Sequence, residues 1–254
     1  MSSQKEIQKS FIYENKKSNT MIIFIHGILE GPNQFRKFTD VVHKEGFSYY
    51  AVLLDGHGKS GKDFARSNKY KWIYDVEKVI LKYKDNYENI ILVGHSMGGL
   101  LSVLLSLKYK NKIKGLVLIS APFKIFVKPN MIISSIRIAL GKIREEDILA
   151  IHIQKALSVK RCSPLTYLKW IPRYMDLFAL IILSRKELKN IEIPTLIVHC
   201  KKDEVVSNKS LKVFENELQN DYKVINLEKS GHFCYDGSEI KDLLNEFNIF
   251  INEL

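Results

Sequence analysis

Short apolar runs rich in β-branched residues alternate along this chain with segments of helical periodicity, and this alternation restricts the fold most strongly. The apolar runs are residues 21–25, 48–54, 89–93, 114–120, 193–200 and 222–227. The segments with helical spacing are 35–45, 72–84, 100–109, 210–218 and 238–252. Strands that alternate with helices are typical of a mostly parallel sheet flanked by helices. We therefore predict an α/β fold with a parallel central sheet.

The alternation is interrupted over residues 123–190, where helical patterns follow one another with no clear strand between them. Candidate helices are 131–143, 145–159 and 164–188, separated by Gly141 and by the pair Ser163-Pro164. We predict that 123–190 is a helical cap, or lid, inserted into a core made of 1–122 and 191–254. The preceding strand should end at the edge of the sheet where functional loops gather. The alternative is that the segment is an ordinary packing extension of the core.

The chain is basic, with 39 Lys and Arg residues against 28 Asp and Glu residues and a formal net charge of +11. A basic balance can indicate nucleic acid or an anionic surface as the partner. The lysines are scattered, however, and mixed with acidic residues, as at Lys44, Lys82, Lys114 and Lys212. We therefore expect a solvated surface and no nucleic-acid partner, and we keep charge-driven surface binding as an alternative.

Hydrophobic residues make up 46% of the 254 residues, as in globular proteins that bury a sizeable core. The segment 1–13 is polar and lacks the apolar stretch of a signal peptide, and no apolar run approaches the length of a membrane span. We therefore expect a cytoplasmic protein without stable membrane insertion. Cys162, Cys200 and Cys234 show no C-x-x-C spacing, so we expect neither a disulfide framework nor a metal site.

The strongest local motif is GHSMGG at residues 94–99, between a predicted strand and a predicted helix. A serine hydroxyl is a weak nucleophile and needs an exposed position beside a base. A sharp strand-to-helix turn provides that position but crowds the backbone, so its flanking residues must be small, as Gly94 and Gly98 are. We predict that Ser96 is a nucleophile held in such a turn, in which His95 takes part.

Two further residues suit an acid and a base for this serine. Asp203 follows the apolar run 193–200, and His232 follows the run 222–227. Both residues come after strand ends, and the carboxyl ends of parallel strands share one edge of the sheet with Ser96. We predict that His232 is the base and that Asp203 orients it.

Other residues compete for these two roles. Glu204 should point the other way in the alternation that follows the strand. Asp236 is too close to His232 in sequence to reach it from a separate strand end. His199 lies inside a predicted strand, where a core or surface-facing position fits better than that of a base. We therefore prefer Asp203 as the acid.

Acyl transfer to a serine builds a negative charge on oxygen, which two backbone N–H groups should hold. The tripeptide HGI at 26–28 follows the first apolar run, and the helix after Ser96 directs its N-terminal N–H groups toward the same place. We predict that the N–H groups of Ile28 and Met97 form this oxyanion hole, with Gly27 giving the backbone room to turn inward.

These motifs resemble those of the α/β-hydrolase superfamily and, within it, bacterial carboxylesterases and monoacylglycerol lipases with a helical cap. The resemblance runs from about residue 20 to the C-terminus and rests on His26-Gly27, DGHGKS at 55–60, GHSMGG at 94–99, DEVV at 203–206 and SGH at 230–232. It implies an α/β-hydrolase fold, a Ser–Asp–His triad and hydrolysis of small acyl esters without a cofactor. A serine at position 96 argues against the dehalogenase and epoxide-hydrolase branches, which use an aspartate there.

Several reactions can use the same three residues. Thioesters, peptides and transfer of the acyl group to another alcohol are alternatives to ester hydrolysis. A second hypothesis is a ligand-binding protein that keeps the fold without useful turnover, although the complete set Ser96, Asp203 and His232 argues against it. The apolar residues of 123–190 either line a pocket for a fatty or aromatic acyl group or pack the segment onto the core.

Overall fold

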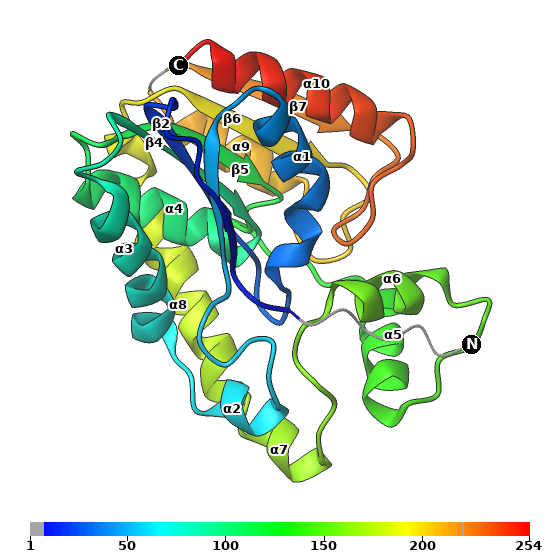
Figure 1. The fold of residues 1–254 in the computed structure, drawn as a ribbon. Helices are drawn as coiled ribbons and strands as arrows, with labels where there is room; N and C mark the ends of the chain where they lie inside the picture. Colours follow the sequence, from blue (N-terminus) through cyan, green and yellow to red (C-terminus); the bar gives the residue numbers. More distant parts are fainter. Residues whose placement is uncertain (1–7, 220) are drawn as a thin grey trace.

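The computed structural model describes residues 8–219 and 221–254. Residues 1–7 belong to the segment 1–13, in which no signal peptide is expected, and they lie outside the described residues. A twisted sheet runs through the centre, and helices cover both of its faces (Figure 1). Within the described ranges, no helix is long and apolar enough to cross a membrane.

Seven strands form the sheet in the order β1-β3-β2-β4-β5-β6-β7. Their bounds are Phe11–Tyr13 (β1), Thr20–Ile25 (β2), Ser48–Val52 (β3), Asn89–His95 (β4), Ile113–Ile119 (β5), Thr195–Cys200 (β6) and Tyr222–Leu227 (β7). β1 is antiparallel to β3, and every other pair of neighbours in this sheet is parallel. The prediction of a mostly parallel central sheet is confirmed.

The strand order changes direction at β2, because β3 lies on one side of β2 and β4 lies on the other. Loops that leave the carboxyl ends of two such strands separate, and ligands of open α/β sheets bind in the crevice between them. Here the two loops start at His26 after β2 and at Ser96 after β4. The topology thus brings two of the predicted functional segments to one crevice.

The helices form one layer on each face of the sheet. Their bounds are Pro32–Phe35 (η1), Arg36–Lys44 (α1), Gly61–Ala65 (α2), Lys69–Tyr83 (α3), Met97–Lys108 (α4), Pro129–Leu140 (α5), Ile148–Ala156 (α6), Pro164–Leu168 (α7), Ile171–Glu187 (α8), Leu188–Asn190 (η2), Lys209–Glu217 (α9) and Glu239–Asn252 (α10). α1 and α10 cover one face, and α3, α4, α8 and α9 cover the other (Figure 1).

A separate hydrophobic core lies under each layer of helices. Beneath α1 and α10, the ring of Phe247 lies 5.2 Å from that of Phe38 and 6.4 Å from that of Phe24, measured between centroids. The opposite core contains Trp72 of α3 and Leu101 of α4, both fully buried. Because both faces of the central strands β2, β4, β5 and β6 are covered, each of these strands forms a nearly continuous apolar run in the sequence.

The segment 123–190 consists of two parts that pack differently. α5 and α6 pack on each other through Ile138, Ala150 and Ile153, which form a small cluster of their own. In contrast, α8 packs against α3 and α4, and its Leu180 is fully buried in the main core. The assignment of 123–190 as a cap, or lid, inserted into the core stays a prediction.

Three elements differ from what the sequence pattern predicts. β1 and α2 were not predicted, because both are too short to show a periodic pattern. The start of α2 is fixed by a capping box formed by Ser60 and Asp63. The single helix expected over 164–188 is divided into α7 and α8. The division has a local cause, because Pro172 in the first turn of α8 has no N–H group to continue an earlier helix.

Replacing Phe247 with alanine should lower the free energy of unfolding by about 3–5 kcal/mol, because the fully buried ring would leave a cavity between β2, α1 and α10. Ile249→Ala is the matched control, since this side chain lies on the same helix but is exposed, and it should change stability by about 0.5 kcal/mol. Urea unfolding followed by circular dichroism measures both. Equal losses would contradict this description of the core.

Candidate active site

Ser96 occupies the turn between β4 and α4 with a strained backbone, at φ 52° and ψ −120°. Glycines on either side make the turn possible. A Cβ atom on Gly94 would lie 2.4 Å from the backbone of Gly98, and one on Gly98 would lie 1.9 Å from the carbonyl oxygen of Ile25. Neither position has room for a side chain, because backbone atoms occupy the space.

Two backbone N–H groups near this turn are unpaired. In the described part of the chain, neither Ile28 nor Met97 has a hydrogen-bond partner for its N–H group. Met97 is the first residue of α4, so the positive end of the helix adds to the potential there. Two free donors at neighbouring strand ends could hold a negatively charged oxygen.

Two buried histidines hold the loop after β2 in place. His26 donates from Nδ1 to the carbonyl of Gly27 at 2.8 Å and accepts the N–H group of Leu54 at Nε2, at 3.1 Å. His57 accepts the N–H group of Leu29 at Nε2, at 3.0 Å. Burial lowers the pKa of His26 to about 4, so its ring stays neutral and keeps an acceptor nitrogen.

Asp203 and His232 lie side by side beyond the ends of β6 and β7. Asp203 Oδ2 lies 2.8 Å from His232 Nδ1, and Asp203 Oδ1 accepts the N–H groups of Val205 and Val206 at 2.8 and 2.6 Å. These bonds orient both side chains, which are buried. Burial alone would raise the pKa of Asp203, but His232 and the two N–H donors outweigh it and lower the pKa below its ordinary value.

The competing residues contact other groups. Glu204 Oε2 accepts the backbone N–H group of His232 at 2.9 Å, so it supports the loop rather than the imidazole. Asp236 is bonded to the turn that precedes α10, and His199 is bonded to a side-chain amide before α9. Among the carboxylates of the described residues, Asp203 alone is hydrogen-bonded to the His232 ring.

Glu30 is a second buried carboxylate in this site, and the sequence motifs did not single it out. Its Oε2 accepts the N–H group of Gly27 at 2.9 Å and lies 2.8 Å from His95 Nδ1, while Oε1 lies 3.8 Å from His232 Nε2. Burial alone raises the pKa of Glu30, but His95 and His232 outweigh it and lower the pKa to about 2. The available signal was an acidic residue three positions after Gly27, in the loop that leaves β2.

His232 is the group on which both carboxylates act. Burial alone would lower its pKa, but the charges of Asp203 and Glu30 outweigh burial and raise the pKa above its ordinary value. The rings of His95 and His232 lie 4.8 Å apart, which places His232 beside the turn at Ser96. Over the described residues, no hydrogen bond joins Ser96 to His232. The structure therefore brings Asp203 and His232 together and places Ser96 next to them.

Glu30, His95 and His232 also form a group that could hold a metal ion, since one ligand atom from each lies within 4.8 Å of the others. Carboxylate and imidazole are ligands that divalent ions such as Zn²⁺ accept. Coordination would occupy the ring nitrogen that a base uses. Metal binding and proton transfer therefore exclude each other at His232.

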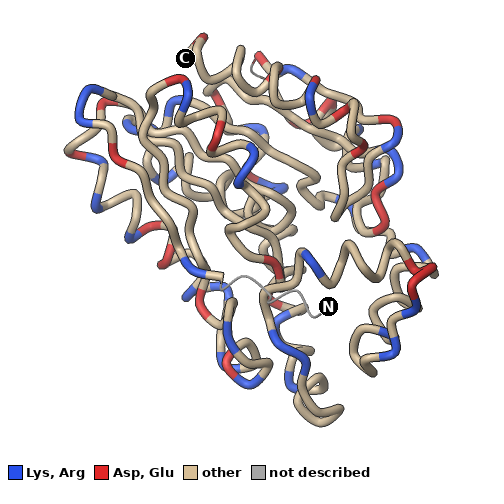
Figure 2. Tube along the Cα trace, turned by 45° about the vertical axis from the view of Figure 1, so that its right-hand side comes forward, with Lys and Arg blue, Asp and Glu red and all other residues tan. Residues whose placement is uncertain are grey.

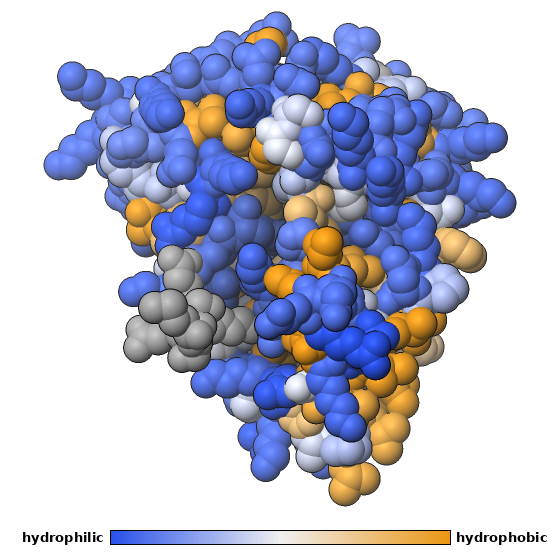
Figure 3. All heavy atoms as spheres, turned by 90° about the vertical axis from the view of Figure 1, so that its right-hand side faces the viewer, coloured by the Kyte–Doolittle hydropathy of each residue, from blue (hydrophilic) through white to orange (hydrophobic). Residues whose placement is uncertain are grey.

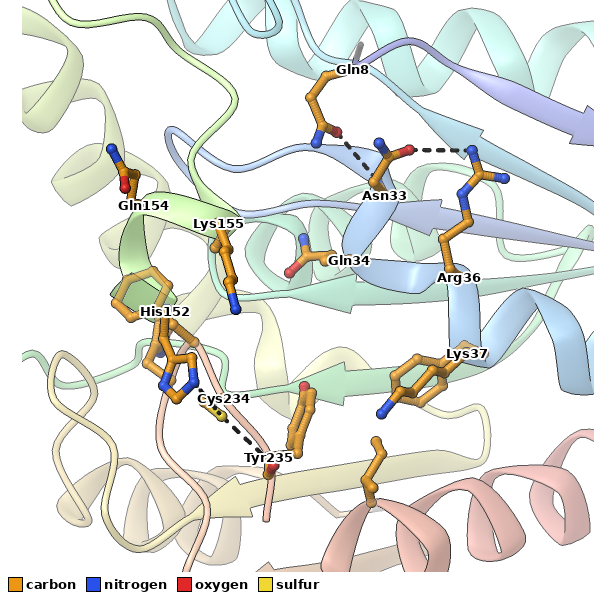
Figure 4. A pocket seen from close by; sticks show the side chains of 15 residues that line it. Gln8, Asn33, Gln34, Arg36, Lys37, His152, Gln154, Lys155, Cys234 and Tyr235 are labelled. Carbon is orange, nitrogen blue, oxygen red and sulfur yellow. Dashed lines mark hydrogen bonds between the residues drawn. The ribbon is translucent and has the colours of Figure 1, made fainter. Parts of the chain in front are cut away.

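A cavity of about 690 Å³ opens next to His232, between α1, α6 and the loop after β7 (Figure 4). Such a volume is typical of sites for small molecules. The cavity is lined by Gln8, Asn33, Gln34, Arg36, Lys37, Phe38, His152, Gln154, Lys155, Ala156, His232, Phe233, Cys234, Tyr235 and Ile240. Of the predicted site residues, His232 is the one that the cavity reaches.

The sheet, its helices and the turn at Ser96 define an α/β-hydrolase fold. The solved structure reported for LipS and LipT, two metagenome-derived lipolytic enzymes, superposes with a TM-score of 0.77 at 17% sequence identity, over 98% of each chain. At this level of identity the likeness shows the fold alone. The prediction of an α/β-hydrolase fold is confirmed.

The chain belongs to the family described as serine aminopeptidase, S33, whose model matches residues 16–233, more than half of the sequence. It is 28% identical to the AB hydrolase superfamily protein YisY of Bacillus subtilis, over 89% of this chain and 91% of that protein. It is also 29% identical to the thermostable monoacylglycerol lipase of Bacillus sp. H-257, over 39% of this chain and 40% of the lipase. By distant homology, the protein is an esterase- or lipase-like α/β-hydrolase.

Replacing Glu30 with glutamine should lower the pKa of His232, because one of the charges that favour the protonated ring is removed. A histidine titration by NMR measures this pKa directly. Asp236→Asn is the control, since Asp236 lies four residues after His232 but is bonded to Ser238 instead. An unchanged His232 pKa in the Glu30→Gln variant would mean that the Glu30 charge does not reach the ring.

Replacing Gly98 with alanine should destabilise the protein by about 3 kcal/mol or more, because the new Cβ atom would meet the Ile25 carbonyl oxygen and the backbone would have to shift. Gly237→Ala is the control, since no atom lies within 4 Å of a Cβ atom built there. Chemical unfolding of both variants provides the comparison. Similar midpoints for the two would argue against close packing of the turn.

Proposed function

We propose that the protein is a serine hydrolase that cleaves carboxylic esters through an acyl-enzyme, with Ser96 as nucleophile, His232 as base and Asp203 as the residue that orients the base. The observation that carries the proposal is the strained turn at Ser96 beside the buried pair of Asp203 and His232. Strain of this kind persists where the surrounding structure maintains it, and it clusters at functional sites. The esterase- and lipase-like homology of the chain supports the same reaction class.

In the proposed reaction, neutral His232 takes the proton of Ser96 while the serine oxygen bonds to the ester carbonyl carbon. The N–H groups of Ile28 and Met97 hold the resulting oxyanion. The bond between the acyl carbon and the alcohol oxygen then breaks, and His232 passes its proton to the leaving alcohol. Water, activated by His232, attacks the acyl group and releases the acid and the free serine.

The charges around the cavity favour an ester over a peptide substrate. The family carries the description of a serine aminopeptidase, and an enzyme of that kind has to hold the positively charged amine of a peptide N-terminus. Carboxylates suit that purpose because they pair with cations. The charged residues that line the cavity are instead Arg36, Lys37 and Lys155, with no Asp or Glu among the described lining residues. They would repel a cationic N-terminus.

Ser96→Ala should lower the hydrolysis of p-nitrophenyl esters by at least about a thousandfold and abolish labelling by a fluorophosphonate probe, because both reactions require the serine oxygen. Wild-type protein should gain the mass of one probe molecule, as detected by intact-mass measurement. A series of p-nitrophenyl esters of increasing acyl length then determines how long an acyl group the site accepts.

Ser106→Ala is the matched control for this experiment. Ser106 is a buried serine of α4, and its hydroxyl donates locally to the carbonyl of Val103. This variant should keep both activity and labelling. Folded wild-type protein that is neither active nor labelled would favour the ligand-binding hypothesis. Faster turnover of an acyl thioester than of the oxygen ester with the same acyl chain would favour a thioesterase.

A further inference from the structure

The cavity beside His232 has a basic lining. Its charged lining residues, Arg36, Lys37 and Lys155, are all cations. None of the three forms an ion pair with a carboxylate of the described residues. Elsewhere on the trace, basic and acidic residues lie close together at several places (Figure 2). The cavity therefore differs from the mixed surface around it.

Two of these cations stand where the helix dipole disfavours them. Arg36 and Lys37 are the first two residues of α1, at its positive end, and no acidic residue occupies this first turn. The guanidinium of Arg36 lies 3.9 Å above the ring of Phe11, which holds it at the rim of the cavity. An anion bound in the cavity would compensate the repulsion that both side chains experience.

Lys37 and Lys155 approach the cavity from opposite sides. Lys155 extends from α6 and Lys37 extends from α1 toward the same space (Figure 4). Burial and the charge of Glu204 raise the pKa of the Cys234 thiol, and the charges of Lys155 and Lys37 both oppose that rise. Both ammonium groups therefore act on one region of the cavity, which Gln34 and Gln154 also line.

The position of His232 indicates which part of an ester enters this cavity. His232 lines the cavity, whereas Ser96 does not. In the proposed reaction the leaving alcohol receives its proton from His232, so a cavity that His232 lines is a suitable place for this alcohol. On the face seen in Figure 3, hydrophilic residues border the central hollow together with hydrophobic ones. The cavity lining includes Gln34 and Gln154, whose amide groups can form hydrogen bonds with a polar alcohol.

We propose that this cavity binds a phosphate group on the leaving alcohol, so that the substrates are acyl esters of a phosphate-bearing alcohol such as glycerol phosphate. The inference rests on the proposed ester hydrolysis. A phosphate carries about two negative charges and several acceptor oxygens, which matches Lys37 and Lys155 with Arg36 at the rim. A neutral alcohol such as glycerol would leave all three cations unpaired.

The reaction leaves the phosphate unchanged. The Ser96 oxygen bonds to the acyl carbon and an oxyanion forms. The bond from that carbon to the alcohol oxygen then breaks, and the alcohol oxygen takes the proton from His232. Glycerol phosphate leaves, and water then releases the fatty acid from Ser96. The cations thus act by holding the leaving group, and no oxidant, reductant or second substrate is required.

The test compares two substrates with the same acyl chain, 1-lauroylglycerol and 1-lauroylglycerol 3-phosphate, at concentrations below micelle formation. Wild-type kcat/KM should be about a hundredfold higher for the phosphate ester, since each of two hydrogen bonds to a charged group contributes about a factor of ten. Each of the variants Lys37→Gln and Lys155→Gln should reduce the ratio of the two kcat/KM values by about tenfold. The double variant should show no preference.

Lys110→Gln is the matched control for each single variant. Lys110 is exposed and follows α4, at the edge of the sheet opposite the candidate site, and its replacement changes the net charge by the same amount. This variant should keep the wild-type preference. A similar loss of preference in Lys110→Gln would assign the effect to the net charge of the whole chain, +11, and would overturn the proposal.

Product-like inhibitors identify the anion. Glycerol 3-phosphate should inhibit hydrolysis of p-nitrophenyl esters by wild type more strongly than glycerate or glycerol, and the double variant should lose this inhibition. Equal inhibition by glycerate would overturn the assignment to phosphate. Equal or faster hydrolysis of 1-lauroylglycerol by wild type would overturn the inference while ester hydrolysis stands. Absence of all ester hydrolysis and of fluorophosphonate labelling would refute the proposed function itself.

Discussion

A close contact between the first turn of α4 and the end of β2 organises the carboxyl edge of the sheet. Gly98 lies against the carbonyl oxygen of Ile25 with no space for a side chain. The contact brings the start of α4 up to the loop after β2 and closes the turn that holds Ser96 at φ 52°. The strain is maintained because β2 and β4 are paired neighbours whose apolar residues are fully buried on both faces of the sheet. A local distortion is thus stabilised by the most rigid part of the molecule.

The charges around that turn are compensated by hydrogen bonds, without which their burial would be costly. Asp203 accepts two backbone N–H groups and contacts the ring of His232. Glu30 accepts the N–H group of Gly27, contacts His95 and accepts a side-chain amide as well. The proposed chemistry needs one carboxylate, and the second has a consequence for the base. Its charge stabilises the protonated form of His232, which favours proton uptake from the serine and opposes the return to the neutral base.

Much of the fold was predictable because its signals are local. β2 and β4 to β6 read as apolar runs since they are buried on both faces. The predicted functional residues could be placed because parallel strands end at one edge. β1 has three residues at the edge of the sheet, too few for a periodic pattern. Glu30 escaped prediction for another reason. Its partners His95 and His232 come close to it only in the folded chain, and His95 is 65 residues away in sequence.

Local patterning was therefore enough to identify six of the seven strands of the sheet, most helices and the glycine-flanked turn at Ser96, because periodicity and backbone sterics act between near neighbours. It also identified the predicted functional residues that follow strand ends. The folded chain was needed to show which of several carboxylates contacts His232 and that Glu30 joins it. It was equally needed to show that Lys37 and Lys155 share one cavity. These relations depend on distances of a few ångströms between segments far apart in sequence, and the packing of helices on the sheet sets those distances.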